Sequence, residues 1–197
     1  MHPFKDFIIN NPKGLYIDIG AGTPKEYNYS SILYNKGYKG LLAEPSPILI
    51  PLLSNERPKD IIYKGAIVNY TGEIILSTKN MYGITMETWI HEAHKAILRG
   101  ETPCSQDFKV RCTTFAKLIK KYPNFINASF LSIDVDGNEK EILSGINFDE
   151  FKPSLIIIEY KKRNFDYHII WEGFLKNYKL VKETYTSLFY KRRTNEV

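Results

Sequence analysis

Short apolar runs alternate with amphipathic stretches along most of the chain. The apolar runs predict buried strands at Leu15–Ile19, Gly40–Glu44, Ile61–Val68, Phe130–Asp134 and Leu155–Tyr160. Between them, apolar positions at helical spacing predict helices at about 24–35, 47–55, 113–122, 138–145 and 167–177. The runs LLAE and IIIE are apolar up to their last residue, which is typical of parallel strands covered by helices on both faces. A closing pair, YKLVKET and SLFYKR, predicts a hairpin at the sheet edge, so the pattern indicates an α/β fold with a mixed, mostly parallel sheet.

Residues 79–109 interrupt this alternation. The stretch ETWIHEAHKAILRG predicts a helix of about three turns, and ETPCSQDFK predicts a loop. Long irregular segments in a compact domain are commonly functional. We therefore predict a single domain over residues 1–197, in which the insertion at about 79–109 forms a lid over the substrate.

Composition indicates the cellular compartment of the protein more clearly than its activity. The chain has 197 residues, a net charge of +5 and two cysteines. Its first residues, MHPFKDFIINNPKG, carry charges and prolines where a signal peptide needs an apolar stretch, and no apolar run is long enough to span a bilayer. These features predict a cytoplasmic protein with reduced thiols and no membrane span. The charge excess is mild, so a nucleic-acid partner is disfavoured without being excluded.

The stretch YIDIGAGTPKEY places a glycine-rich turn between a strand and a helix, which is where open α/β sheets bind ligands. Thr23 is predicted to be the N-cap of that helix, with Pro24 at N1 and Glu26 closing a capping box. The turn residues predicted to bind a cofactor are Asp18, Gly20, Ala21 and Gly22.

The charge of the turn distinguishes between two cofactor classes. The dinucleotide fingerprint needs a third glycine where this chain has Lys25, and Asp18 would repel a pyrophosphate. S-adenosylmethionine carries an ammonium and a sulfonium but no phosphate, so an acidic strand end favours it. Glu44, at the end of the second strand, can accept both hydroxyls of an adenosine ribose, a role that NAD shares with S-adenosylmethionine. We therefore predict S-adenosylmethionine as the cofactor.

Two blocks of the chain resemble the FkbM family of S-adenosylmethionine-dependent methyltransferases. The first is YIDIGAGTPKEYNYSSILYNKGYKGLLAEPSP, with an Asp-x-Gly-Ala turn and a Glu-Pro strand end. The second is CTTFAKLIKKY followed by FLSIDVDGNEKEILSGINF and PSLIIIEYK, similar to the family's Lys-Ile-Asp-Val-Glu-Gly-x-Glu block. Ser132, Asp136 and Gly22 depart mildly from the family's lysine, glutamate and asparagine.

The resemblance implies a Rossmann-like class I methyltransferase fold, with a seven-stranded, mostly parallel sheet and an antiparallel last strand. It implies methyl transfer to a hydroxyl, commonly on a sugar, a glycan or a related natural product. It also adds Pro45, Ala66 and Asp134 to the predicted cofactor-binding residues. The small-molecule or glycan acceptor and the oligomeric state are left open.

Methyl transfer from a sulfonium needs an aligned acceptor oxygen and a group that takes its proton. The predicted catalytic residues are Asp134 and Glu159, at the ends of the fourth and fifth strands, and His168 just beyond the fifth. A backbone-capping role is the alternative for Asp134, and a solvated or capping role for His168. Asn138 and Glu141 predict a second capping box after Asp134.

A metal ion is possible but not predicted. Asp134, Asp136 and Glu159 could gather a divalent cation, yet DVDGNEKEI does not match a calcium-binding loop. His91 and His94 are spaced i, i+3 instead of the i, i+4 spacing of zinc proteases, so surface positions are their simplest interpretation.

Two other functions are compatible with the sequence. An RNA ribose 2′-O-methyltransferase would use a Lys-Asp-Lys-Glu set, for which Lys13, Asp134, Lys161 or Lys162, and Glu183 stand in a compatible order. A protein that binds S-adenosylmethionine without catalysis is the second alternative. Steep salt dependence of RNA binding would favour the first, and cofactor binding without turnover would favour the second.

Overall fold

The computed structural model describes residues 2–25, 28–81, 85–89, 107–135, 137–160 and 171–193. The strands of its larger sheet are β1 (Leu15–Ile19), β2 (Lys39–Glu44), β3 (Ile61–Lys64), β8 (Phe130–Ile133), β9 (Leu155–Glu159), β10 (Tyr178–Glu183) and β11 (Ser187–Arg192). Within the described residues this sheet has seven strands in the order β10–β11–β9–β8–β1–β2–β3. Strands β1, β2, β3, β8 and β9 are parallel, and β11 pairs antiparallel with β9. The predicted mostly parallel sheet with an antiparallel last strand is confirmed.

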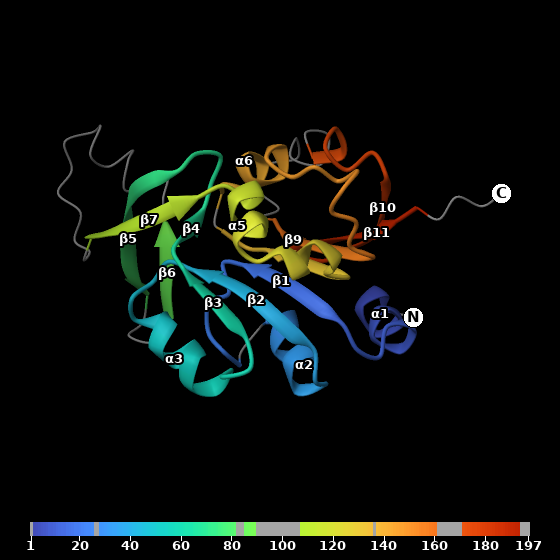
Figure 1. Cartoon of the computed structure of the whole chain (residues 1–197), viewed down its shortest axis with the longest axis horizontal. Coiled ribbons are helices and arrows are strands. Elements are labelled where there is room, and N and C mark those ends of the chain that lie inside the picture. The colour runs from blue at the N-terminus through green and yellow to red at the C-terminus, as the bar shows by residue number, and fades with distance from the viewer. Residues whose placement is uncertain are drawn as a thin grey trace.

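Helices cover both faces of this sheet (Figure 1). On one face lie α1 (Pro3–Asn10), α2 (Tyr29–Asn35) and α3 (Leu49–Glu56). On the other lie α5 (Phe115–Lys121), the 3-10 helix η1 (Pro123–Asn127) and α6 (Glu139–Ser144). Among the described residues, no helix is both long enough and apolar enough to cross a bilayer.

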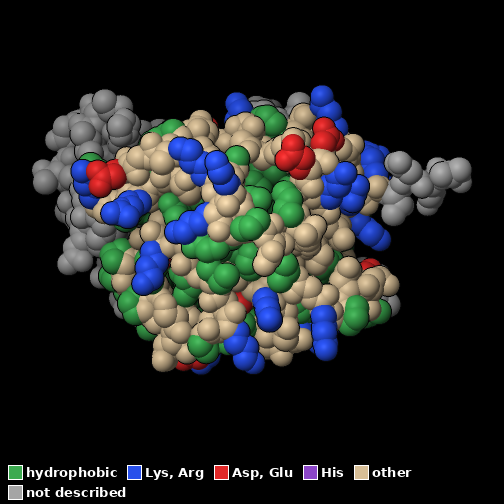
Figure 2. All heavy atoms as spheres, in the orientation of Figure 1, with side chains coloured by type: hydrophobic (Ala, Val, Ile, Leu, Met, Phe, Trp, Pro, Cys, Tyr) green, Lys and Arg blue, Asp and Glu red, His purple; other side chains and the backbone are tan. Residues whose placement is uncertain are grey.

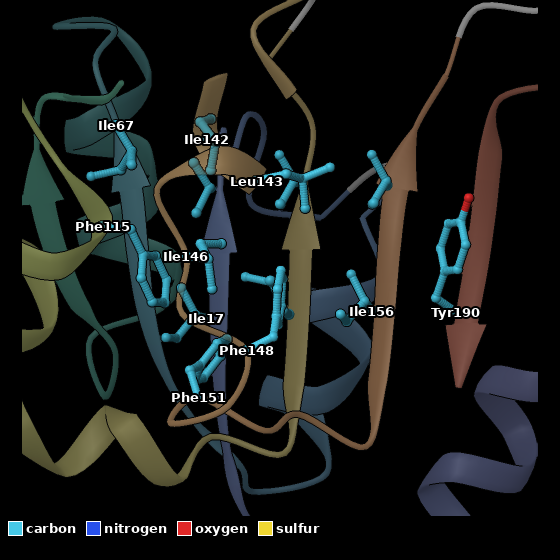
Figure 3. Close-up of a cluster of buried hydrophobic side chains, with 14 of the residues drawn as sticks. Ile17, Ile67, Phe115, Ile142, Leu143, Ile146, Phe148, Phe151, Ile156 and Tyr190 are labelled. Atoms are coloured by element: carbon cyan, nitrogen blue, oxygen red, sulfur yellow. The ribbon is translucent and has the colours of Figure 1, made fainter. Parts of the chain in front are cut away.

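The apolar runs form the core because successive residues of a buried strand face opposite helical layers. Tyr16 packs with the layer of α1, α2 and α3, whereas its neighbour Ile17 packs with the layer of α5 and α6. Figure 3 shows Ile17 and Ile156 of the sheet among the side chains of the second layer. Continuous apolar runs are therefore what this sheet requires.

Helix α1 was not among the predicted elements. His2 is its N-cap, since the ring Nδ1 accepts a hydrogen bond from the Phe4 amide at 3.3 Å, and Pro3 lies in the first turn. Phe4 and Phe7 are buried, and their rings lie 5.7 and 5.6 Å from that of Phe130. The eight-residue helix is therefore held by two aromatic anchors, a signal too short to predict from its periodicity.

Part of the predicted insertion forms strands of a second, smaller sheet. Its strands are β4 (Ala66–Ile67), β5 (Gly72–Met81), β6 (Thr85–Trp89) and β7 (Asp107–Thr113), in the order β4–β7–β5–β6. The predicted helix beginning at Glu87 is wrong over Glu87–Trp89, where the chain pairs with β5, and the predicted loop is wrong over 107–109, which belong to β7. Pairing with β5 outweighs the local helical pattern because Thr and Trp favour strands. Residues 90–106 lie outside the described part.

The predicted third strand, Ile61–Val68, is divided between the two sheets. Strand β3 ends at Lys64, and the Gly65 amide donates a hydrogen bond to the Glu44 carbonyl at 3.1 Å. A Cβ on Gly65 would lie 2.6 Å from the Arg111 carbonyl oxygen of β7. The chain therefore passes from one sheet to the other at a glycine, directly beside the end of β2.

Candidate functional site

The glycine-rich turn lies where three parallel strands end. The amides of Gly20 and Ala21 donate to the Ala43 carbonyl near the end of β2, at 2.9 and 3.2 Å. The Asp134 amide, just after β8, donates to the Ile19 carbonyl at 2.9 Å. The carboxyl ends of β1, β2 and β8 therefore meet at this turn, which is the place where open α/β sheets bind ligands.

Two glycines shape the turn in different ways. Gly20 has φ 81°, and a Cβ there would lie 1.7 Å from the Asp134 carbonyl oxygen, so that only glycine fits. Gly22 has φ 60°, but among the described residues a Cβ there would approach only the Gly20 carbonyl oxygen, at 3.9 Å. The side of the turn at Gly22 is therefore open to a ligand, as a cofactor cradle requires.

The predicted start of the following helix is wrong. Helix α2 begins at Tyr29 and its N-cap is Asn28, whose Oδ1 accepts a hydrogen bond from the Ser30 amide at 2.8 Å. Thr23 lies in a bend upstream of the helix, and Glu26 lies outside the described residues. Asparagine is at least as good an N-cap as threonine, so sequence alone could not choose between the two positions.

Asp18 is buried next to the glycine turn and is connected to it by hydrogen bonds through Asn28. Its side chain is 1% exposed, and its Oδ2 accepts hydrogen bonds from the Ser30 hydroxyl and, at 3.3 Å, from Asn28 Nδ2. Asn28 Nδ2 also donates to the Ala21 carbonyl at 2.6 Å. Burial raises the pKa of Asp18, while the nearby Arg57 guanidinium and the hydrogen bonds oppose that rise. The predicted attraction for a cationic cofactor would therefore act through the field of a buried carboxylate.

Glu44 lies at the end of β2 with both carboxylate oxygens on backbone amides. Oε2 accepts from Gly22 and Oε1 from Ser46, each at 2.8 Å, and the residue is 3% exposed. Burial, with a smaller contribution from Asp18, raises the pKa of Glu44 to about 7. Each carboxylate oxygen retains a second lone pair, so the group could still accept ribose hydroxyls. Pro45 follows it, half-buried.

Ala66 lies in the second sheet. It is 5% exposed and pairs with Cys112 of β7, one residue after Gly65 contacts the Glu44 carbonyl. Its predicted contact with the cofactor stays a prediction, whereas its proximity to the end of β2 is a feature of the fold.

The two predicted catalytic carboxylates stand at the ends of adjacent strands. Asp134 follows the last residue of β8 and its side chain is exposed, while Glu159 ends β9 and is half-buried. Because β8 and β9 pair in parallel, both residues lie at the same edge of the sheet as the glycine turn. His168, Asp136, His91 and His94 lie outside the described residues.

Glu139 is a residue of this edge that the sequence did not single out. It is 7% exposed, and its Oε1 accepts from the amides of Gly137 and Val135 at 3.1 and 3.3 Å. Burial, with a smaller contribution from Glu159, raises its pKa. Its position matches the final Glu of the family block, which was the available signal. The predicted capping box is wrong, because Asn138 makes no side-chain cap hydrogen bond.

Within the described residues, no group of three or more His, Cys, Asp and Glu side chains could hold a metal ion. A groove of about 790 Å³ lies between α1, the start of β9, the middle of β10 and the end of β11, with residues such as Phe7, Ser154 and Arg192 in its lining. Ser154 directly precedes β9 and Leu155 begins it, so this groove is at the opposite edge of the sheet from the glycine turn.

The strand order, the glycine turn and the acidic residue at the end of β2 together define the class I S-adenosylmethionine-dependent methyltransferases. In that order the last strand lies antiparallel between the fifth and sixth strands of the sheet, as β11 does between β9 and β10. The model of the methyltransferase FkbM domain matches residues 18–180. The chain therefore belongs to the FkbM methyltransferase family.

Solved structures agree with the fold. A TehB-like SAM-dependent methyltransferase from Corynebacterium glutamicum is 10% identical, with a TM-score of 0.50 over 96% of this chain and 87% of that one. A putative type 11 methyltransferase from Sulfolobus solfataricus is also 10% identical, with a TM-score of 0.50 over 98% of this chain and 90% of that one. At such identity these neighbours show the fold alone. No curated protein matches the chain.

The chain is thus an S-adenosylmethionine-dependent methyltransferase. The cofactor supplies an electrophilic methyl group on a sulfonium. The residues that would hold it fit that ligand, because the turn is open at Gly22 and the buried carboxylates of Asp18 and Glu44 lie beneath and beside it.

Proposed function

We propose that the enzyme transfers the methyl group to a hydroxyl of a sugar, a glycan or a related natural product. The observation that carries this proposal is an exposed carboxylate, Asp134, whose backbone touches the glycine turn. An acceptor hydroxyl brought to the open side of the turn would meet Asp134 as a general base, and Glu159 lies at the end of the next strand. His168 is kept as a third proposed catalytic residue.

The second sheet supports the proposed lid. It begins at Ala66, immediately beyond the contact between Gly65 and Glu44, so its first strand starts beside the cofactor turn. Residues 79–109 belong to or connect β5, β6 and β7 of this sheet. We propose that this part covers the acceptor within one methyltransferase domain over 1–197, and that the cytoplasm, where the buried free thiol of Cys112 stays reduced, is its compartment.

The proposal is tested by a methyl-transfer screen. Purified protein is incubated with labelled S-adenosylmethionine and sugar nucleotides, free glycans or capped RNA. Transfer to a carbohydrate hydroxyl supports the proposal. Transfer to RNA alone would overturn it, and cofactor binding with no transfer to any acceptor would favour the non-catalytic alternative.

The role of Asp134 is tested on the acceptor that the screen identifies. Asp134→Asn keeps the shape of the side chain but removes its basicity, so turnover should fall by about 10²–10⁴-fold. The affinity for S-adenosylhomocysteine should stay within about twofold, because the backbone contact with Gly20 is kept. Undiminished turnover would assign the base to another residue.

An RNA ribose 2′-O-methyltransferase is the second candidate, and one surface feature favours it. The face seen in Figure 2 carries many Lys and Arg side chains and few Asp and Glu. Lys121 Nζ lies 5.9 Å from the ring centre of Tyr63 and 5.3 Å from that of Tyr122, and such mixed basic and aromatic surfaces suit nucleic acid. Glu183, in the Lys-Asp-Lys-Glu set, accepts a hydrogen bond from the Tyr160 hydroxyl at 3.0 Å. A steep loss of RNA affinity with salt would support this candidate.

A further inference from the structure

Arg57 is a charged side chain in the interior, directly after α3. It is 1% exposed, and its Nε donates to Asp60 Oδ2 at 2.9 Å. The Tyr16 hydroxyl accepts from Arg57 Nη2 at 2.7 Å and donates to Asp60 Oδ2 at 2.5 Å. The second oxygen of Asp60 accepts from the Gly40 amide at 2.7 Å. Arg57 is therefore fixed on one side by a fully satisfied carboxylate.

On its other side, Arg57 reaches the cofactor turn through one hydroxyl. Its Nη2 donates to Ser30 Oγ at 2.9 Å, and Ser30 in turn donates to Asp18 Oδ2. Asp18 also accepts from Asn28 Nδ2, which holds the Ala21 carbonyl of the turn. A continuous chain of hydrogen bonds therefore joins the end of α3 to the glycine turn.

The charges of this cluster do not balance. Arg57 carries one positive charge, and Asp60 and Asp18 would carry two negative charges between them. Asp60 contacts the guanidinium directly, whereas Asp18 reaches it only through Ser30. A buried carboxylate without a directly bound cation is costly in free energy. A second positive charge near the glycine turn would therefore stabilise Asp18.

Among the described residues, the other groups around Asp18 do not supply that charge. Ser132 of β8 provides a hydrogen bond, and Glu44 of β2 is a second carboxylate. Arg57 Nη1 is buried and has no hydrogen-bond partner in the part of the chain that the structure describes.

We propose that Arg57 is a positioning residue for the methyl donor. Through Ser30 it keeps Asp18 charged and in place, so that the turn attracts the ammonium of the amino-acid end of the cofactor. The inference concerns cofactor binding only and does not depend on which acceptor is methylated. In this proposal Arg57 acts on the cofactor only through Ser30 and Asp18.

The test compares two ligands that differ in their charged end. S-adenosylhomocysteine has the amino-acid group, and methylthioadenosine has the same nucleoside without it. In Arg57→Met the guanidinium that opposes the burial-driven rise in the pKa of Asp18 is absent, so the charged form of Asp18 is disfavoured. We expect calorimetry to show about tenfold weaker S-adenosylhomocysteine binding, with methylthioadenosine changed by less than about twofold. Part of the lost affinity should return as the pH is raised, because a higher pH favours the charged form of Asp18.

Three variants make the result decisive. Arg57→Lys keeps the charge and should recover affinity to within about threefold of wild type. Arg192→Met, the same change at an exposed arginine of β11, should leave both affinities unchanged. If Arg57→Met does not fold, Ser30→Ala decides, since it interrupts the chain while leaving Arg57 on Asp60 and Tyr16.

Equal losses for both ligands in the folded variant would show a purely structural role and overturn the proposal, as would no loss for either. Binding of S-adenosylhomocysteine to the wild type is measured in the same experiment. The outcome is therefore separate from that of the acceptor screen.

Discussion

Glu44→Gln tests the electrostatics of the cofactor turn most directly. Glu44 is 3% exposed, and its pKa is raised from 4.5 to about 7. The difference, 7 − 4.5 = 2.5 units, corresponds to about 3 kcal/mol between the two protonation states at ~1.4 kcal/mol per unit. Because the folded state binds the Glu44 proton more tightly than the unfolded state does, the protonated group stabilises the fold by this amount. The stabilisation is present in full below pH 4.5 and is lost as the pH rises through 7.

The assay is urea unfolding at pH 5, 6, 7 and 8. The free energy of unfolding of the wild type should fall by about 2–3 kcal/mol relative to that of Glu44→Gln between pH 5 and 8, because glutamine does not titrate. The variant also loses one of the two acceptors for the amides of Gly22 and Ser46. This loss lowers its free energy of unfolding by an amount that does not change with pH. Other titrating groups are common to both proteins and cancel in the difference.

Glu56→Gln is the matched control, since Glu56 is exposed at the end of α3. The free energy of unfolding of Glu56→Gln should change with pH in the same way as that of the wild type. Parallel curves for the wild type and Glu44→Gln would show that Glu44 does not titrate between pH 5 and 8. The assignment of a raised pKa to its burial would then be refuted.

Two further substitutions test the packing of the turn and of α1. Gly20→Ala would place a Cβ 1.7 Å from the Asp134 carbonyl oxygen, so thermal unfolding should show a protein that is severely destabilised or unfolded. Gly37→Ala is its control, with φ 86° but no atom of the described residues within 4 Å of the added Cβ, and should cost only about 1 kcal/mol; equal losses would contradict the clash. Phe4→Ala removes a ring that is 4% exposed and contacts Phe130, and should cost about 3 kcal/mol in urea unfolding, whereas a cost near zero would mean that α1 is not docked.

The central sheet could be predicted because its strands are buried on both faces. The bounds of β1 were predicted to the residue, and those of β9 to within one residue. A glycine directly precedes β1, and a proline and a serine directly precede β9. The turn after β1 and the carboxylate at the end of β2 followed from the same logic, because parallel strands bring their carboxyl ends to one edge.

Other elements depend on contacts that the sequence does not display. Thr23 and Asn28 are both good N-caps, and the choice between them is made by Asn28, which bonds to Asp18 and to the Ala21 carbonyl. Strand β6 forms where a helical pattern was predicted, because β5 is available to pair with it. Arg57 was overlooked because its connection to Asp18 runs through Ser30 and exists only in three dimensions.

The two buried carboxylates also explain why this glycine turn suits a cationic cofactor. Asp18 lies beneath the turn and Glu44 binds its Gly22 amide, and the charge of Asp18 contributes to the raised pKa of Glu44. A pyrophosphate would add further negative charge beside Glu44, whose ionisation Asp18 already disfavours. A sulfonium and an ammonium would offset that repulsion and favour the charged form of Glu44. Binding of the cofactor should therefore release protons near neutral pH, which makes the preference for a cationic ligand a property of these two side chains and not of the glycines alone.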